Sequence, residues 1–289
     1  MQNEITGRIA NALKLKLLEV EAARPADYSD AVDCILRGRA VLMKPVSRDN
    51  YVEAIGHYEQ ALALDPASVD AQSLLAGALA GRVLDQMTDT VPADIERAER
   101  LIRQAVAAAP RNPLARVARG LLWNVQNRFD DAIDEFEAAL EFNPNWASVF
   151  ALLGQSKLLT GSLDEAILLQ EKAIRLSPRD PYISQFYFRV GVANLLRSRI
   201  DEAIVWLKRA QVANDEHPAP HAWLAAAYGV KGETQQAFAE LTAARKMSGD
   251  DRYSSIARLR SSGMRAPKVR ALFEATYFAG LRKAGMMEG

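Results

Sequence analysis

Residues 120–144 read GLLWNVQNRFDDAIDEFEAALEFNP, and residues 154–178, thirty-four positions later, read GQSKLLTGSLDEAILLQEKAIRLSP. Each stretch opens on glycine, carries alanine at offsets of 12 and 19, and closes on proline at offset 24. The apolar residues recur at helical spacing on both sides of a polar turn. Small residues at fixed places let two helices approach closely, while bulky neighbours fill the space around them. The sequence therefore predicts a helix pair that repeats along the chain.

The same spacing continues on both sides of these two stretches. It recurs at Gly191 after three added residues, and it reaches back to Ala76 and Gly38 with about ten and about four residues added. The six predicted units are 27–66, 67–110, 111–144, 145–178, 179–215 and 218–248. The pattern resembles the 34-residue tetratricopeptide repeat. This resemblance implies an all-α, right-handed superhelical solenoid of about six helix pairs.

The two ends depart from the repeat. Residues 1–26 are predicted to form an N-terminal capping helix, and residues 249–289 to form C-terminal capping helices. The apolar side of the first helix comprises Ile5, Ile9, Leu13, Leu17 and Leu18. That of the second, over residues 267–283, comprises Val269, Leu272, Phe273, Tyr277 and Leu281. We expect both helices to cover the apolar ends of the solenoid; docking of a partner or a neighbouring domain is the alternative. The insertion near residues 81–94 is expected to lengthen a helix.

Composition excludes some classes of partner. The 289 residues carry 36 basic and 36 acidic side chains, which gives no electrostatic reason to expect nucleic acid or an anionic membrane surface. No apolar run approaches the ~18 residues that cross a bilayer, so we expect no direct membrane insertion. A cytoplasmic location is favoured. A periplasmic location would need a transmembrane segment elsewhere in a longer parent chain.

The sequence contains no recognisable catalytic or cofactor motif, such as a phosphate loop, His-Glu-x-x-His or Gly-x-Ser-x-Gly. His217 and His221 flank two prolines, which argue against a helical presentation, so we interpret them as loop histidines and not as metal ligands. The one cysteine, Cys34, is predicted to lie in the core. We therefore expect no enzyme activity, no catalytic residue, no metal and no cofactor.

The first helix of each pair lines the concave side of such a solenoid. Its groove-facing positions give the candidate ligand-binding residues Arg39, Leu121, Asn124, Gln155, Leu158, Phe188 and Val192, and Arg189 and Trp223 beside these positions are added as candidates. Repeats that grip an acidic C-terminus carry Lys and Asn where this chain has Val117 and Leu121, so no carboxylate clamp is expected. The groove suits an amphipathic helix or an extended apolar peptide, or part of a parent protein. Packing between repeats is the alternative for each of these residues.

Three short segments carry a more specific resemblance. QNEITGRIANAL at residues 2–13, DCILRGRA at 33–40 and FEATYFAGLRKAG at 273–285 resemble the C-terminal repeat region of bacterial class III adenylate/guanylate cyclases. In that family the cyclase domain precedes the repeats. This chain lacks the cyclase domain and its metal-binding aspartates, so the resemblance implies a regulatory or sensory module without activity of its own.

Two functions are consistent with these patterns. We favour a protein–protein interaction module whose partner is a protein, a peptide or an adjoining domain of a longer chain. The alternative is an assembly or envelope scaffold that forms homo-oligomers through its end helices.

Overall fold

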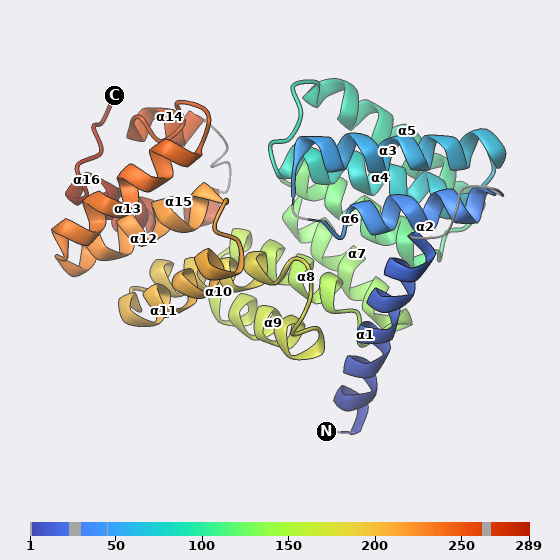
Figure 1. Cartoon of the computed structure of the whole chain (residues 1–289), viewed down its shortest axis with the longest axis horizontal. Helices are drawn as coiled ribbons and strands as arrows, with labels where there is room; N and C mark the ends of the chain where they lie inside the picture. Colours follow the sequence, from blue (N-terminus) through green and yellow to red (C-terminus); the bar gives the residue numbers. More distant parts are fainter. Residues whose placement is uncertain (1, 23–29, 45, 262–266) are drawn as a thin grey trace. The chain divides into compact units, whose positions relative to one another are not determined.

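The computed structural model describes residues 2–22, 30–44, 46–261 and 267–289. These residues form helices joined by short turns (Figure 1). Within the described ranges, the only β-type pairing is an isolated bridge between Ser255 and Met287. The all-α fold class expected from the sequence is therefore confirmed. The chain divides into two compact units, Met1–Leu153 with Arg175–Tyr182, and Gly154–Ile174 with Ile183–Gly289.

The first unit contains an N-terminal helix and three consecutive helix pairs, followed by the start of α8. Its helices are α1 (Gln2–Ala22), α2 (Ala31–Val41), α3 (Arg48–Leu64), α4 (Val69–Leu84), α5 (Val91–Ala108), α6 (Pro113–Val125), α7 (Phe129–Phe142) and the first part of α8 (Ala147–Thr160). The two helices of each pair pack side by side, and α6 also packs along α4.

The second unit contains the rest of α8, most of α9 and two complete helix pairs, followed by the C-terminal segment. Its complete α-helices are α10 (Ile183–Leu196), α11 (Ile200–Ala213), α12 (Pro218–Lys231), α13 (Thr234–Met247) and α14 (Ile256–Ser261), and α9 spans Leu163–Leu176. The last part joins a 3-10 turn η2 (Pro267–Val269), α15 (Arg270–Phe273), a π-helical turn η3 (Glu274–Phe278) and α16 (Ala279–Lys283). These four elements follow one another without a break over the range in which the sequence predicted one helix.

Turn residues fix where the helices begin. The Ser47 and Ser68 hydroxyls each accept a hydrogen bond from the backbone N–H three residues on, and Asn112 caps α6 through two backbone N–H groups. Such side chains satisfy donors that the first turn of a helix leaves free. Pro113 and Pro218 are the first residues of α6 and α12, where a missing N–H costs nothing. Local chemistry therefore sets the helix boundaries.

Small residues at the crossing of the two helices hold each pair together, as the repeat predicts. A Cβ at Gly120 would lie 2.6 Å from the ring of Phe136, and a Cβ at Gly191 would lie 2.6 Å from Leu207. Phe136 and Leu207 are fully buried. Each bulky side chain therefore occupies the space that the missing glycine side chain leaves.

The insertion in the second pair lengthens α4 to Leu84 and delays α5 until Val91, as expected. Polar contacts hold it in place. Arg82 forms a largely buried ion pair with Asp94, whose side chain is only 4% exposed, and the Tyr51 hydroxyl donates to Asp85 at 2.8 Å. The insertion is therefore packed into the first unit.

The expectation for α1 is wrong in one respect. The helix forms over Gln2–Ala22, but Ile5, Ile9, Leu13 and Leu17 are each more than half exposed, so they do not cover the first repeat. The helix contacts the first unit through its other face. An amphipathic pattern indicates that a helix has an apolar stripe, but it does not indicate which part of the protein covers that stripe. The side chain of Leu18 and the boundary near residues 26 and 27 lie outside the described residues.

Candidate binding surface

In the first unit, α6 carries the aliphatic part of the predicted groove. Leu114, Val117 and Leu121 lie three and four residues apart on one side of the helix, and all three are half-buried. We call them the α6 row. Gly77 of the neighbouring α4 lies beside this row, because a Cβ at Gly77 would lie 3.8 Å from Leu121 Cδ1. The α6 row is thus a partly solvent-accessible aliphatic surface next to a helix position that has no side chain.

The polar groove candidates of the first unit lie in different surroundings. Asn124 follows the α6 row on the same helix but is only 3% exposed, so its amide belongs to the interior. Arg39 is half-buried on α2 near the buried Tyr58. Burial raises the pKa of the Tyr58 hydroxyl, and the Arg39 charge opposes that rise. Of the two, only Arg39 remains accessible to a ligand.

Tyr182 covers the end of α2, a contact that sequence reasoning missed. Its hydroxyl donates to the carbonyl of Leu42, which lies 140 residues away in the chain. Its backbone N–H donates to Asp180 at 3.0 Å. Burial and the nearby Asp85 and Asp180 carboxylates raise the pKa of Tyr182. No local pattern marks such a long-range contact, since Tyr182 lies in the turn between α9 and α10.

In the second unit, the groove-facing side of α12 is covered by the C-terminal helix. Ala222, Ala226 and Gly229 are all buried. A Cβ at Gly280 would lie 2.0 Å from the carbonyl oxygen of Ala226, and a Cβ at Gly229 would lie 2.1 Å from that of Gly280. The two helix backbones therefore touch, which only residues with small side chains permit.

An aromatic cluster completes this contact. Trp223 of α12 is 8% exposed and stacks on Tyr277 at 4.1 Å between ring centroids. Phe188 of α10 meets Trp223 edge to face at 6.0 Å, and Phe273 meets it at 5.4 Å. The structure thus brings Phe188 and Trp223 together, as the groove assignment groups them. Because Tyr277 and Phe273 occupy the space beside Trp223, Trp223 is covered by the chain's own C-terminal helix.

The other candidates of the second unit divide by exposure. Leu158 on α8 and Val192 on α10 are 6% and 4% exposed, and both contribute to packing. Gln155 and Arg189 are half-buried at neighbouring positions of the same two helices. Among the predicted binding residues of the second unit, Gln155 and Arg189 are therefore the polar side chains that remain partly accessible.

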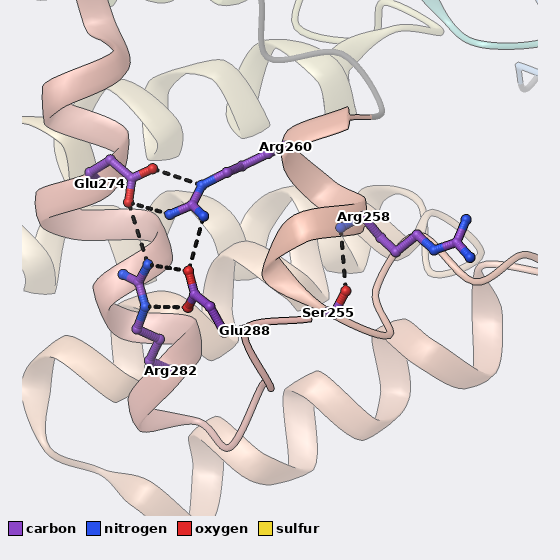
Figure 2. A network of polar contacts seen from close by, with 6 residues as sticks. All are labelled: Ser255, Arg258, Arg260, Glu274, Arg282 and Glu288. Carbon is purple, nitrogen blue, oxygen red and sulfur yellow. Dashed lines mark hydrogen bonds and ion pairs between the residues drawn. The ribbon is translucent and has the colours of Figure 1, made fainter.

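An exposed ion-pair network fastens the C-terminal segment (Figure 2). Arg260 donates to Glu274 through two nitrogens, at 2.9 and 2.8 Å, and to Glu288 at 2.9 Å. Arg282 also donates to Glu288 at 2.9 Å. The guanidinium groups lower the pKa of both carboxyls: Arg260 acts mainly on Glu274 and Arg282 mainly on Glu288. The network joins α14, η3, α16 and the last residues of the chain.

One of the two histidines differs from its expected loop placement. His217 lies in the turn before α12, as its N-cap residue, whereas His221 lies within that helix, because prolines are tolerated in a first turn. Burial lowers the pKa of His217 to about 4. His221 Nδ1 lies 2.6 Å from Glu240 Oε2 and 3.0 Å from Gln211 Nε2. Both histidines therefore belong to packed interfaces of the second unit.

The described residues contain no group of three or more His, Cys, Asp or Glu side chains placed to hold a metal ion. A search of the same residues for membrane-spanning helices found none that is both long and apolar enough. Cys34 is 1% exposed, in agreement with its predicted place in the core.

Comparison with sequence families identifies the repeat. Family models described as tetratricopeptide repeat match residues 93–147 and residues 147–180. Residues 93–180 are therefore similar to tetratricopeptide repeats.

Solved structures share the fold. The Cut9–Hcn1 hetero-tetramer of APC/C matches 85% of this chain with a TM-score of 0.65 at 15% identity, and this chain spans 45% of the matched chain. Pseudomonas aeruginosa PilF matches 81% of this chain and 97% of its own length, with a TM-score of 0.55 at 18% identity. A human IFIT1 dimer with PPP-AAAA matches 75% of this chain and 50% of its own, with a TM-score of 0.60 at 20% identity. At these identities the similarity establishes the fold alone.

Proposed function

We propose that this chain is a protein–protein interaction module that binds an apolar peptide or amphipathic helix of a partner along the α6 row. Tetratricopeptide proteins generally mediate protein–protein interactions and are typically non-catalytic. The observation that carries the proposal is the partial exposure of Leu114, Val117 and Leu121 on the side of α6 that the repeat pattern predicts to face the groove. The equivalent side of α12 is covered by the chain's own C-terminal helix. A partly exposed aliphatic row on one unit is what a helix-in-groove partner would use.

The expected ligand follows from the side chains around the row. The row is aliphatic over two helical turns, and the adjacent Gly77 leaves room for ligand side chains. Arg39 on α2 is the accessible cation among the groove candidates of this unit. We therefore propose a ligand with aliphatic or aromatic anchors three or four residues apart and few charges along the anchored face.

We further propose a regulatory or sensory role within a longer parent protein. The resemblance of residues 2–13, 33–40 and 273–285 to the C-terminal region of class III cyclases supports this role. In that arrangement, residues 27–248 would form six repeats between the two terminal segments, and an adjoining domain would be the regulated partner. A cytoplasmic location is proposed on the same basis.

A peptide selection tests the binding proposal. A phage-displayed library of random peptides is selected on the chain, with counter-selection on a Leu121→Glu variant. Fluorescence anisotropy then measures the chosen peptides on both proteins and on Val52→Glu, which alters an equally aliphatic but exposed site on α3. We expect Leu121→Glu to weaken binding at least about tenfold, because a carboxylate in an apolar contact loses its hydration, and Val52→Glu to leave binding unchanged. Equal affinity for all three proteins would exclude the α6 row as the binding surface.

A further inference from the structure

Helix α1 is fixed to the first unit by one face only. A Cβ at Gly7 would lie 2.7 Å from the side chain of Asn145, so the backbone of α1 touches the turn before α8. The Asn11 amide donates to the carbonyls of Asn145 at 3.1 Å and Leu176 at 3.2 Å. These contacts orient the helix and leave the side chains of its opposite face largely exposed.

That opposite face is a continuous aliphatic stripe. Ile5, Ile9, Leu13, Leu17 and Val20 are each between 51% and 65% exposed. We call these five residues the α1 stripe. Together they expose on the order of several hundred Å² of apolar surface, a size that marks interaction sites in soluble proteins. Isolated exposed apolar residues need no explanation, but five at successive turns of one helix do.

A hollow lies beside one half of the stripe. A cleft of about 360 Å³ is lined by Ile5, Ile9 and other α1 residues, and by Ser177–Arg179 of the same unit. Leu17 and Val20 do not line it and project from the other half of the stripe. The N-terminal half of the stripe therefore borders a cleft, and the C-terminal half does not.

We propose that the α1 stripe binds the α1 stripe of a second copy of this chain, antiparallel, with the two-fold axis near Leu13. Ile9 and Leu17 lie four residues on either side of Leu13. The antiparallel arrangement therefore places Leu17 and Val20 of each copy beside the cleft of the other. A two-fold interface needs such self-complementarity, because each contact occurs twice.

The spacing of the stripe supports a helix as the occupant. Ile5, Ile9, Leu13 and Leu17 form one ridge of side chains four residues apart. Two ridges of this kind interdigitate in the commonest class of helix packing, with the axes crossing at about −50°. A second copy supplies an identical ridge, and Leu13, the most exposed member at 65%, lies at the proposed centre. This inference is independent of the α6 row.

Sedimentation velocity on the full chain tests the proposal. We expect the wild-type protein to change from mostly monomer at about 5 µM toward dimer at about 200 µM, because a small apolar interface gives weak affinity. Leu13→Glu would place two carboxylates together at the two-fold axis, so we expect the dissociation constant of the dimer to rise at least about tenfold. Val52→Glu, a matched change on α3, should behave as wild type, and circular dichroism checks that the variants fold. A monomer throughout, or an unaffected dimer in Leu13→Glu, would overturn the proposal.

Cysteine cross-linking tests the antiparallel arrangement, using the low background from the buried Cys34. A disulfide needs Cα atoms within about 7 Å. Leu13→Cys should therefore link to itself under mild oxidation. Ile9→Cys alone and Leu17→Cys alone should not link, whereas an equimolar mixture of the two should. Self-linking of Ile9→Cys as efficient as that of Leu13→Cys would contradict the antiparallel pairing.

Discussion

The sides of α6 and α12 that the repeat pattern predicts to face the groove have different side chains and different neighbours. On α6 two of these positions hold Val117 and Leu121, which are half-buried. On α12 the equivalent positions hold Ala222 and Ala226, which are buried, and the carbonyl of Ala226 lies against Gly280 of the C-terminal helix. Side-chain size at these positions therefore determines what can pack there. Small residues admit a helix backbone in direct contact, and larger aliphatic residues keep a helix backbone farther away.

The contact between α12 and α16 explains how the second unit closes its own surface. Gly229 and Gly280 bring the backbones together, and Trp223 and Tyr277 stack beside them. Phe273, Phe278 and Leu281 are also buried in this region. Burial of several large apolar side chains stabilises the docked helix by many kcal/mol, at about 1.5–3 kcal/mol each. The C-terminal helix is thus a permanent part of the second unit.

Breaking the glycine contact should have the largest effect. Gly280→Val would place a side chain against the carbonyl of Ala226, 2.0 Å from the position of Cβ, where no flexible side chain can move away. We expect it to destabilise the second unit by about 4 kcal/mol, at the upper end for overpacking. Chemical denaturation followed by Trp fluorescence measures this loss.

The matched control is Gly56→Ala on α3, where a Cβ would meet nothing within 4 Å. It should stabilise the first unit by up to about 1 kcal/mol, because alanine favours helix more than glycine does. Equal stability changes in the two variants would contradict the backbone contact between α12 and α16.

Removing the buried carboxylate of Asp94 in the first unit should have the second largest effect on stability. Asp94→Ala leaves the Arg82 guanidinium without its buried partner, and we expect a loss of about 3 kcal/mol in the free energy of unfolding. Asp89→Ala removes an exposed partner of Arg48 nearby and should leave the unfolding midpoint unchanged. Urea denaturation of both variants tests the difference. If Asp89→Ala lost stability and Asp94→Ala did not, the buried Arg82–Asp94 pair would not be the stabilising one.

Acid should weaken the second unit through His217. Its pKa is lowered to about 4 by burial, against about 6.5 in an unfolded chain. Below pH 6.5 the unfolded state therefore binds more protons, so stability falls as the pH falls from 6.5 toward 4. We expect a loss of about 2 kcal/mol between pH 7 and pH 5 from this residue. His217→Phe should remove that part of the pH dependence, and an unchanged pH profile would show that His217 is not the group responsible.

The exposed network of Figure 2 should matter least. Glu274→Gln removes a carboxylate that Arg260 and Arg282 share at the surface. Exposed ion pairs are screened by solvent, so the expected loss is below about 1 kcal/mol and should vanish in about 1 M salt. Thermal unfolding at low and high salt measures it. A loss as large as that of Asp94→Ala would mean that the network is needed to hold the C-terminal segment.

The sequence predicted the helix pairs because the repeat is a local pattern. Gly120 and Phe136 are only sixteen residues apart, and their spacing implies their contact. The covering of Trp223 by Tyr277 joins residues 54 positions apart in the chain, and Tyr182 reaches Leu42 across 140. Such contacts depend on how successive pairs pack, which periodicity does not encode. For the same reason the pattern identified the apolar side of α1 but not its exposure.

The most direct test of the difference between α6 and α12 is hydroxyl-radical footprinting of the unmodified chain, read by mass spectrometry. Indole rings react faster than aliphatic side chains, so protection of Trp223 is informative, with the half-buried Trp206 of the same unit as internal reference. We expect Val117 and Leu121 to be oxidised, and Trp223 and Tyr277 to be protected relative to Trp206. Two results would contradict this expectation. Oxidation of Trp223 as fast as that of Trp206 would show that the C-terminal helix does not cover α12, and protection of the α6 row in the free protein would show that this row is not accessible.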